Sequence, residues 1–128
     1  MINIFSRYKF IFYSLNFVII FLYLFPGSVF GFFLYGDLKK QPQITPDFLI
    51  STNHLYAFLI LSVVGFFTFN KIKHFKIISI YLILLSIILE FLHLLIPERS
   101  FQFSDLFGNL IGVVIIVIIS FFKKNEKY

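Results

Sequence analysis

IISIYLILLSIILEFLHLLI, residues 77–96, is the stretch of sequence that decides the fold. Glu90 is its one formally charged residue, and its apolar residues do not alternate with polar ones as they do in a barrel strand. A helix needs about 20 predominantly apolar residues to cross the hydrocarbon core of a membrane. Residues 77–96 are therefore predicted to form a transmembrane helix.

Three other stretches lack Asp, Glu, Lys and Arg, namely residues 10–36, 48–70 and 106–122. Together with residues 77–96, they are long enough for four spans of about 20 residues each. The sequence predicts an all-α fold, a four-helix transmembrane bundle that forms a single membrane domain over residues 1–128. The expected helices lie at about 10–26, 49–69, 77–96 and 104–122.

The composition excludes several classes of protein. The 128-residue chain is 59% hydrophobic and 13% charged, with a mean hydropathy of +0.94. Soluble domains contain roughly 25% charged residues, and a domain of this size could not bury so much apolar surface in one core. A soluble globular enzyme and a disordered linker are excluded. The absence of Cys also excludes a disulfide scaffold and a thiolate metal site.

The basic residues predict the orientation in the membrane. Eight of the eleven Lys and Arg residues fall on one side of a four-helix bundle, and five of the six acids fall on the other. The eight are Arg7, Lys9, Lys71, Lys73, Lys76, Lys123, Lys124 and Lys127. Because Lys and Arg are enriched on cytoplasmic loops, we expect both termini to be cytoplasmic, in a multi-pass protein of the plasma membrane. The net charge of +5 then reflects topology, and no nucleic-acid partner is predicted.

The N-terminal segment allows two interpretations. Residues 1–30 could be a cleaved signal peptide with Arg7 and Lys9 as its basic region, although no small-residue cleavage motif follows. Alternatively, Pro26 and Gly27 end the first transmembrane helix, and residues 28–36 then lie along the outer interface. In that case Phe30, Phe32, Phe33 and Tyr35 are aromatic anchors.

Six polar residues are expected to meet at the outer ends of three helices. Glu90 lies six residues before Ile96, which places it roughly 9 Å below the end of its helix, and His93 shares its face. Polar groups inside a membrane are energetically expensive, so they mark candidate functional sites. The candidate binding residues are His54, Glu90, His93, Arg99, Asp105 and Asn109.

Each of these residues also has a purely structural interpretation. His54 and His93 could lie at the membrane interface. Asp105 could cap its helix, and Asn109 could hydrogen-bond to a neighbouring helix. Arg99 could contact lipid head groups.

Glu90 differs from the other five because a carboxylate so deep needs a partner or a proton. Arg99, His54 and His93 are the available partners, and a buried ion pair that fixes two helices is the structural alternative to a site. Gly108 and Gly112 have the small-xxx-small spacing that lets another helix approach closely.

Residues 90–112, EFLHLLIPERSFQFSDLFGNLIG, resemble the signature of the VanZ-like family. That signature has an acid, a polar residue three positions later, Pro and Arg in a short turn, and then Asp, Asn and Gly at the start of the last helix. The matching residues here are Glu90, His93, Pro97, Arg99, Asp105, Asn109 and Gly112. His54, near the start of an earlier helix, and Pro26, at the end of the first, extend the resemblance over about residues 20–122.

The chain departs from the family pattern at three places. Ile50 and Ser51 stand where the family usually has Asp-Lys, His93 replaces the commoner Gln, and Phe58 replaces a Tyr. The resemblance implies a four-helix membrane protein of the bacterial cell envelope. It also implies a link to resistance against teicoplanin-type glycopeptides, with which the founding member is associated.

Three classes of function follow as hypotheses. In the leading one, the outer polar residues form a pocket for a membrane lipid head group or a lipid-linked or amphiphilic small molecule, with Arg99 contacting an anionic group. In the second, Glu90 and a His act as acid and base in an enzyme on a lipid-linked substrate, and Asp105 could complete a metal site. In the third, the cluster only holds helices together for a structural or partner subunit. The chain has no phosphate-binding loop, nucleophile elbow or His-Glu-x-x-His motif, and we predict no cofactor and no metal.

Overall fold

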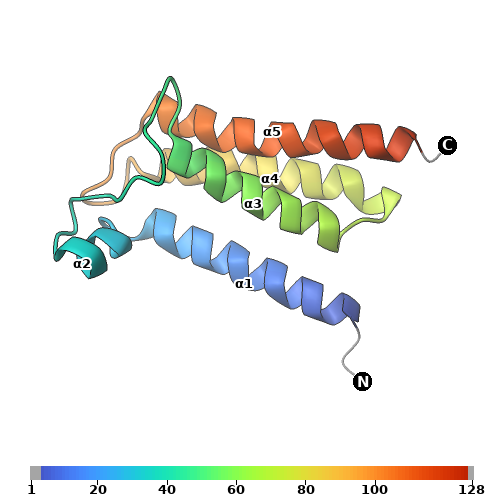
Figure 1. The fold of residues 1–128 in the computed structure, drawn as a ribbon, viewed down its shortest axis with the longest axis horizontal. Helices are drawn as coiled ribbons and strands as arrows, with labels where there is room; N and C mark the ends of the chain where they lie inside the picture. Colours follow the sequence, from blue (N-terminus) through green and yellow to red (C-terminus); the bar gives the residue numbers. More distant parts are fainter. Residues whose placement is uncertain (1–3, 127–128) are drawn as a thin grey trace.

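The computed structural model describes residues 4–126, which are all-helical and contain no β-strand. Its helices are α1 (Ile4–Leu24), α2 (Val29–Tyr35), α3 (Thr52–Thr68), α4 (Ile72–Leu92) and α5 (Phe103–Asn125). Figure 1 shows the four long helices aligned along one axis, with the two termini at one end and α2 at the other. Lys127, one of the residues used to predict orientation, lies outside the described part of the chain.

Three of these helices, α1, α4 and α5, are long and apolar enough to cross a membrane. The fourth, α3, has 17 residues instead of the expected 21 or so, and at 1.5 Å per residue it is about 25 Å long. This is shorter than the hydrocarbon core of about 30 Å. The expected span at 49–69 was therefore too long, because residues 49–51 belong to the preceding loop and Phe69 ends the helix.

The third predicted helix was also misplaced, since α4 covers Ile72–Leu92 and not 77–96. After Leu92 the backbone tightens into successive turns in which the N–H groups of His93, Leu94 and Leu95 bond to carbonyls three residues earlier. Glu90 is therefore in the last turn of its helix, and the depth of 9 Å expected from the sequence is wrong. Its burial comes from the surrounding segments, as described below.

A short helix, α2, was not predicted. The Ser28 hydroxyl accepts a hydrogen bond from the Gly31 N–H at 2.9 Å and caps its start. Gly36 ends it in the left-handed conformation with φ of 65°, which glycine adopts without steric cost. The aromatic side chains of α2 remain at least half exposed, including Phe33 at 77%.

The core lies around α3, which contacts α1, α4 and α5. Phe58, Leu61, Leu82 and Val113 are completely buried there. The first helix belongs to the same core, because α1 contributes Phe12, Ile19 and Tyr23. This packing favours the interpretation of the N-terminal segment as a helix of the bundle.

The close approach predicted at Gly108 and Gly112 is confirmed, and α3 is the helix that approaches. A Cβ atom at Gly108 would lie 2.6 Å from the Ser51 carbonyl oxygen, and one at Gly112 would lie 2.7 Å from that of Leu55. Only glycine fits between α3 and α5 at these two levels. The contact brings the first turn of α3 against the first turns of α5, where the polar residues lie.

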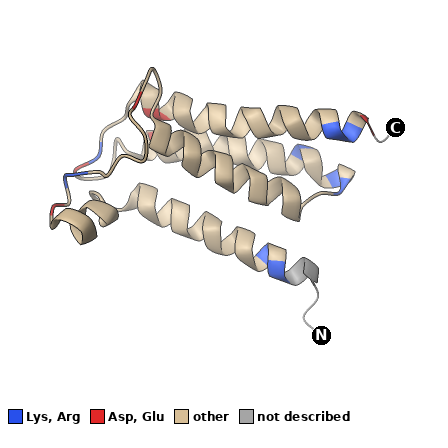
Figure 2. Ribbon diagram, in the orientation of Figure 1, with Lys and Arg blue, Asp and Glu red and all other residues tan. Residues whose placement is uncertain are grey.

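Charge is distributed unevenly along the bundle. Figure 2 shows Lys and Arg at the start of α1, at the α3–α4 turn and at the end of α5, all at the end that carries the termini. The acids gather near the opposite end, with Glu126 as the exception. The helices thus place the basic residues where the predicted orientation requires them to be.

Candidate functional site

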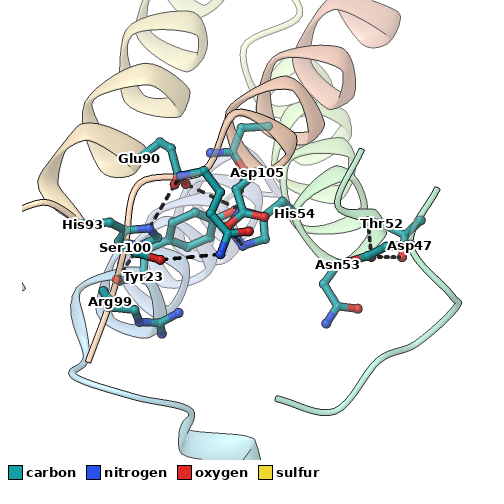
Figure 3. A network of polar contacts seen from close by, with 12 residues as sticks. Tyr23, Asp47, Thr52, Asn53, His54, Glu90, His93, Arg99, Ser100 and Asp105 are labelled. Carbon is teal, nitrogen blue, oxygen red and sulfur yellow. Dashed lines mark hydrogen bonds and ion pairs between the residues drawn. The ribbon is translucent and has the colours of Figure 1, made fainter. Parts of the chain in front are cut away.

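The polar residues singled out in the sequence converge at the end of the bundle away from the termini (Figure 3). They come from the first turn of α3, the last turn of α4, the α4–α5 turn and the first two turns of α5. Glu90 and Asn109 are fully buried, and His93 is 2% exposed. The expected convergence is confirmed, and Glu90 faces the interior of the bundle.

Glu90 is the most enclosed charged group of the described chain. Its Oε1 accepts a hydrogen bond from the Gln102 N–H at 3.1 Å and lies 3.3 Å from His93 Nδ1. Its Oε2 faces the His54 ring, 3.8 Å from Nδ1. Of the three partners that the sequence offered, the two histidines lie within ion-pair distance of Glu90, and Arg99 does not within residues 4–126.

His93 connects Glu90 to the end of α1. Its Nε2 lies 3.0 Å from the Tyr23 carbonyl oxygen, which can only accept, so Nε2 carries a hydrogen. In the neutral ring Nδ1 would then be an acceptor facing a carboxylate oxygen. The contact with Glu90 therefore requires one additional proton, shared by the His93–Glu90 pair.

Asn109 joins three other helices. Its Nδ2 donates to the Ser86 carbonyl oxygen of α4 at 3.1 Å, which fixes the orientation of the amide. Its Oδ1 accepts the Tyr23 hydroxyl of α1 at 2.6 Å and lies 3.1 Å from His54 Nδ1 of α3. The structural role expected for Asn109 is thus real, and it also sets the orientation of the His54 ring.

Arg99 binds backbone carbonyl groups at the end of α1, a role that the sequence did not suggest. Its Nη2 donates to the carbonyl oxygens of Leu22 and Gly27 at 2.8 and 2.7 Å, and its Nε donates to that of Phe25 at 3.1 Å. Pro26 has no N–H, so the Leu22 carbonyl lacks its usual partner four residues later. Arg99 supplies that missing donor and closes the end of α1.

The charge of Arg99 is influenced by its surroundings in opposite directions. Burial lowers the pKa of its guanidinium from the ordinary value, while Tyr23, Asp105 and Glu90 act to raise it. Its Nη1 group makes no hydrogen bond within residues 4–126 and remains free for another partner.

A cavity of about 620 Å³ opens beside this cluster. Its polar wall includes Tyr23, His54, Arg99 and Asp105, all from the cluster or in contact with it. Its apolar wall comes from the end of α1 and from α2 and consists of Leu22, Val29, Phe30 and Leu34. The cavity can therefore contact both a polar group and hydrocarbon.

The loop between α2 and α3 forms the rim of the cavity and is fastened to the start of α3. Asn53 accepts the Ile44 N–H at 3.1 Å and donates to the Pro42 carbonyl oxygen at 2.8 Å. Asp47 accepts the Thr52 N–H at 3.0 Å and satisfies an otherwise free donor at the start of α3. The rim is thus held in place by side chains at its two ends (Figure 3).

Asp105 does not cap α5, because Gln102 occupies the cap position and Asp105 lies in the first turn. Its Oδ2 is 3.7 Å from His54 Nε2. His54, Glu90 and Asp105 together bring three ligand atoms within 4.8 Å of one another. The sequence suggested Glu90, Asp105 and the histidines as a possible ligand set only within the enzyme hypothesis, and the structure selects His54, Glu90 and Asp105 from that set.

Tyr23 and Gln102 are the members of the site that sequence reasoning missed. Tyr23 is 7% exposed, and its ring stacks on that of His93 at 5.7 Å. Its position could have indicated this role. Tyr23 lies about one turn before Pro26, so its hydroxyl group is expected at the same level as the polar residues of the other helices. Gln102 acts through its backbone N–H, for which a sequence carries no signal.

Fold and site together define an all-helical protein with membrane-length apolar helices and a buried polar cluster beside a cavity at one end. Comparison of the chain with protein-family models, with curated proteins and with solved structures gives no match.

Proposed function

We propose that this protein crosses the bacterial plasma membrane four times, with both termini in the cytoplasm, and binds the head group of an amphiphile in its outer cavity. The cavity is the observation that carries the proposal. Its wall combines polar and apolar side chains, and it lies at the end of the bundle opposite the Lys- and Arg-rich end.

Four spans are proposed although α3 is short. It is the central helix of the bundle and contacts the three longer ones, and its start is covered by protein, since Ser51 is buried there. Non-helical backbone is tolerated at membrane depth where protein or a cavity surrounds it. The loop at the start of α3 forms the cavity rim, which supplies such surroundings.

The chemistry of the wall indicates the kind of head group. The free Nη1 of Arg99 suits a phosphate or carboxylate oxygen. His54 and Asp105 can hydrogen-bond to hydroxyl or amino groups beside it. The apolar wall formed by α1 and α2 then receives the start of an acyl or prenyl chain.

The VanZ-like resemblance of residues 90–112 supports the same location and extends the proposal to the cell envelope. Within that resemblance, altered sensitivity to a teicoplanin-type glycopeptide is the cellular property to examine. Binding of an amphiphile at the outer surface is compatible with that property, since a lipophilic glycopeptide is itself an amphiphile.

Filling the cavity should remove the bound amphiphile. Ala57 lines the cavity, and Ala57→Phe places a ring in it. We expect native mass spectrometry of the wild-type protein, purified in a mild detergent, to show one retained lipid per chain, and Ala57→Phe to have lost most of it.

Val63→Phe is the matched control, since it adds a ring to the same helix at a position that is 49% exposed and outside the cavity. It should retain lipid as the wild type does. Equal retention by the Ala57 and Val63 variants, both folded by circular dichroism, would contradict binding in this cavity.

A further inference from the structure

The carboxylate of Glu90 is incompletely satisfied. Oε1 has the Gln102 N–H and His93 as partners, but Oε2 is buried and has no hydrogen-bond partner within the described chain. A buried carboxylate oxygen without a partner is costly, since it has lost its water and gained nothing. Oε2 is directed toward the His54 ring, 3.8 Å from the nearest nitrogen, which is beyond hydrogen-bond distance.

The hydrogen-bond network also sets the tautomer of His54. Asn109 presents its carbonyl oxygen to His54 Nδ1, because its amide nitrogen is used by Ser86. Nδ1 must therefore carry the hydrogen, which leaves Nε2 with a lone pair in the neutral ring. That lone pair lies 3.7 Å from Asp105 Oδ2, another acceptor.

His54 Nε2 and Asp105 Oδ2 are therefore two acceptors 3.7 Å apart, and the unsatisfied Glu90 Oε2 lies beside the same ring. A cation among these three groups would satisfy all of them. We propose that His54 Nε2, Glu90 Oε2 and the Asp105 carboxylate bind one divalent metal ion at the inner wall of the cavity. This goes beyond amphiphile binding and does not depend on it. It also differs from the expectation of no metal drawn from the sequence.

The geometry is close to that of a binding site. Each of the three residues offers a ligand atom within 4.8 Å of the others, whereas two ligands at about 2.1 Å from a tetrahedral zinc ion are about 3.4 Å apart. The most separated pair must therefore close by up to about 1.4 Å, a movement that falls to the partly exposed His54 and Asp105 side chains.

The surroundings also resemble those of metal ligands. A ligating histidine almost always donates its other ring N–H to a carbonyl or carboxylate oxygen, as His54 does to Asn109. One imidazole and two carboxylates suit Zn²⁺ or Mn²⁺. His54 and Asp105 line the cavity, so the remaining coordination positions face it and are open to a water or a ligand oxygen.

The competing occupant of this space is a proton. A protonated His54 would lie between the two carboxylates as an imidazolium ion and would pair with both. Metal titration separates the two possibilities, because an imidazolium ion does not bind a metal.

The test is a cobalt titration of the full chain in detergent after treatment with a chelator. We expect the wild type to bind one Co²⁺ per chain with a visible absorption band, and Zn²⁺ to displace it. Asp105→Asn should weaken binding about tenfold or more. Glu90→Gln should do the same if it folds, but the Asp105 side chain is 17% exposed at the cavity, so its variant is the decisive one.

Asp47→Asn is the matched control, since Asp47 lines the same cavity but caps α3 and lies outside the triad. Its affinity for cobalt should be within about twofold of that of the wild type, a much smaller change than the loss of a ligand causes. The proposal is overturned if the folded wild type takes up no stoichiometric Co²⁺ or Zn²⁺, or if Asp105→Asn binds as tightly as Asp47→Asn.

Discussion

Replacement of Arg99 by glutamine is expected to destabilise the folded protein by about 3 kcal/mol or more. The guanidinium donates to three carbonyl oxygens at the end of α1, and charged hydrogen bonds contribute about 1.5–3 kcal/mol each. Thermal unfolding in detergent and the amount of protein in the membrane would measure the loss.

Two further variants separate hydrogen bonding from charge. Arg99→Lys keeps the charge, but one ammonium group does not reproduce the planar fork of donors, so it should recover only part of the stability. Pro26→Ala returns an N–H to position 26, which can bond to the Leu22 carbonyl oxygen. It should therefore partly rescue Arg99→Gln.

Lys39→Gln serves as the control, because it removes an exposed cation at the same end of the bundle and should change stability by less than about 0.5 kcal/mol. The capping role of Arg99 is contradicted if Arg99→Gln unfolds no earlier than Lys39→Gln. The capping role is also contradicted if the double variant Pro26→Ala with Arg99→Gln is less stable than Arg99→Gln alone.

Asn109→Leu should be about as damaging as the loss of Arg99. It leaves the buried Tyr23 hydroxyl and the partly buried His54 Nδ1–H without their acceptor, and it removes one donor from the Ser86 carbonyl oxygen. Each such group costs about 1–3 kcal/mol when it remains unsatisfied. Tyr23→Phe should cost only about 1 kcal/mol, because Asn109 then keeps its other two bonds.

Asn16→Leu is the matched control for Asn109→Leu. Asn16 also accepts a tyrosine hydroxyl at 2.6 Å, from Tyr81, but that hydrogen bond is exposed. The loss should stay below about 1 kcal/mol, as expected for an exposed neutral hydrogen bond. If denaturant unfolding shows equal losses for Asn16→Leu and Asn109→Leu, Asn109 does not hold the four helices together.

The helices could be predicted from the sequence because their signal is composition over long stretches. The apolar run at 77–96 predicts a helix independently of the neighbouring segments. The spacing of Gly108 and Gly112 predicts a close helix contact. The ends were misplaced because they depend on local hydrogen bonds. The turn after Leu92 and the Ser28 cap of α2 are examples, and neither changes the hydropathy of its segment.

The residues of the site were predicted more accurately than the hydrogen-bond partners of each residue. Buried polar residues in an apolar sequence are conspicuous, so His54, Glu90 and Asn109 stood out. Arg99 was expected to pair with an acid, since charge is visible in a sequence, whereas it bonds to backbone carbonyls, which every residue carries. Pro26 was the one available indication that such carbonyls were free.

Cysteine labelling on the two sides of α3 tests the central claim, that the polar cluster and its cavity lie at the outer end of a four-span bundle. The natural chain has no Cys, so single cysteines in place of Asn53 and Lys73 report the sidedness of the two ends of α3. Both positions carry side chains accessible enough to label, since Asn53 lines the cavity and Lys73 is exposed. An impermeant maleimide added to intact cells should label Asn53→Cys directly, and Lys73→Cys only after the membrane is permeabilised. Labelling of both in intact cells would contradict a membrane-spanning α3, and labelling of Lys73→Cys alone would place the cavity in the cytoplasm.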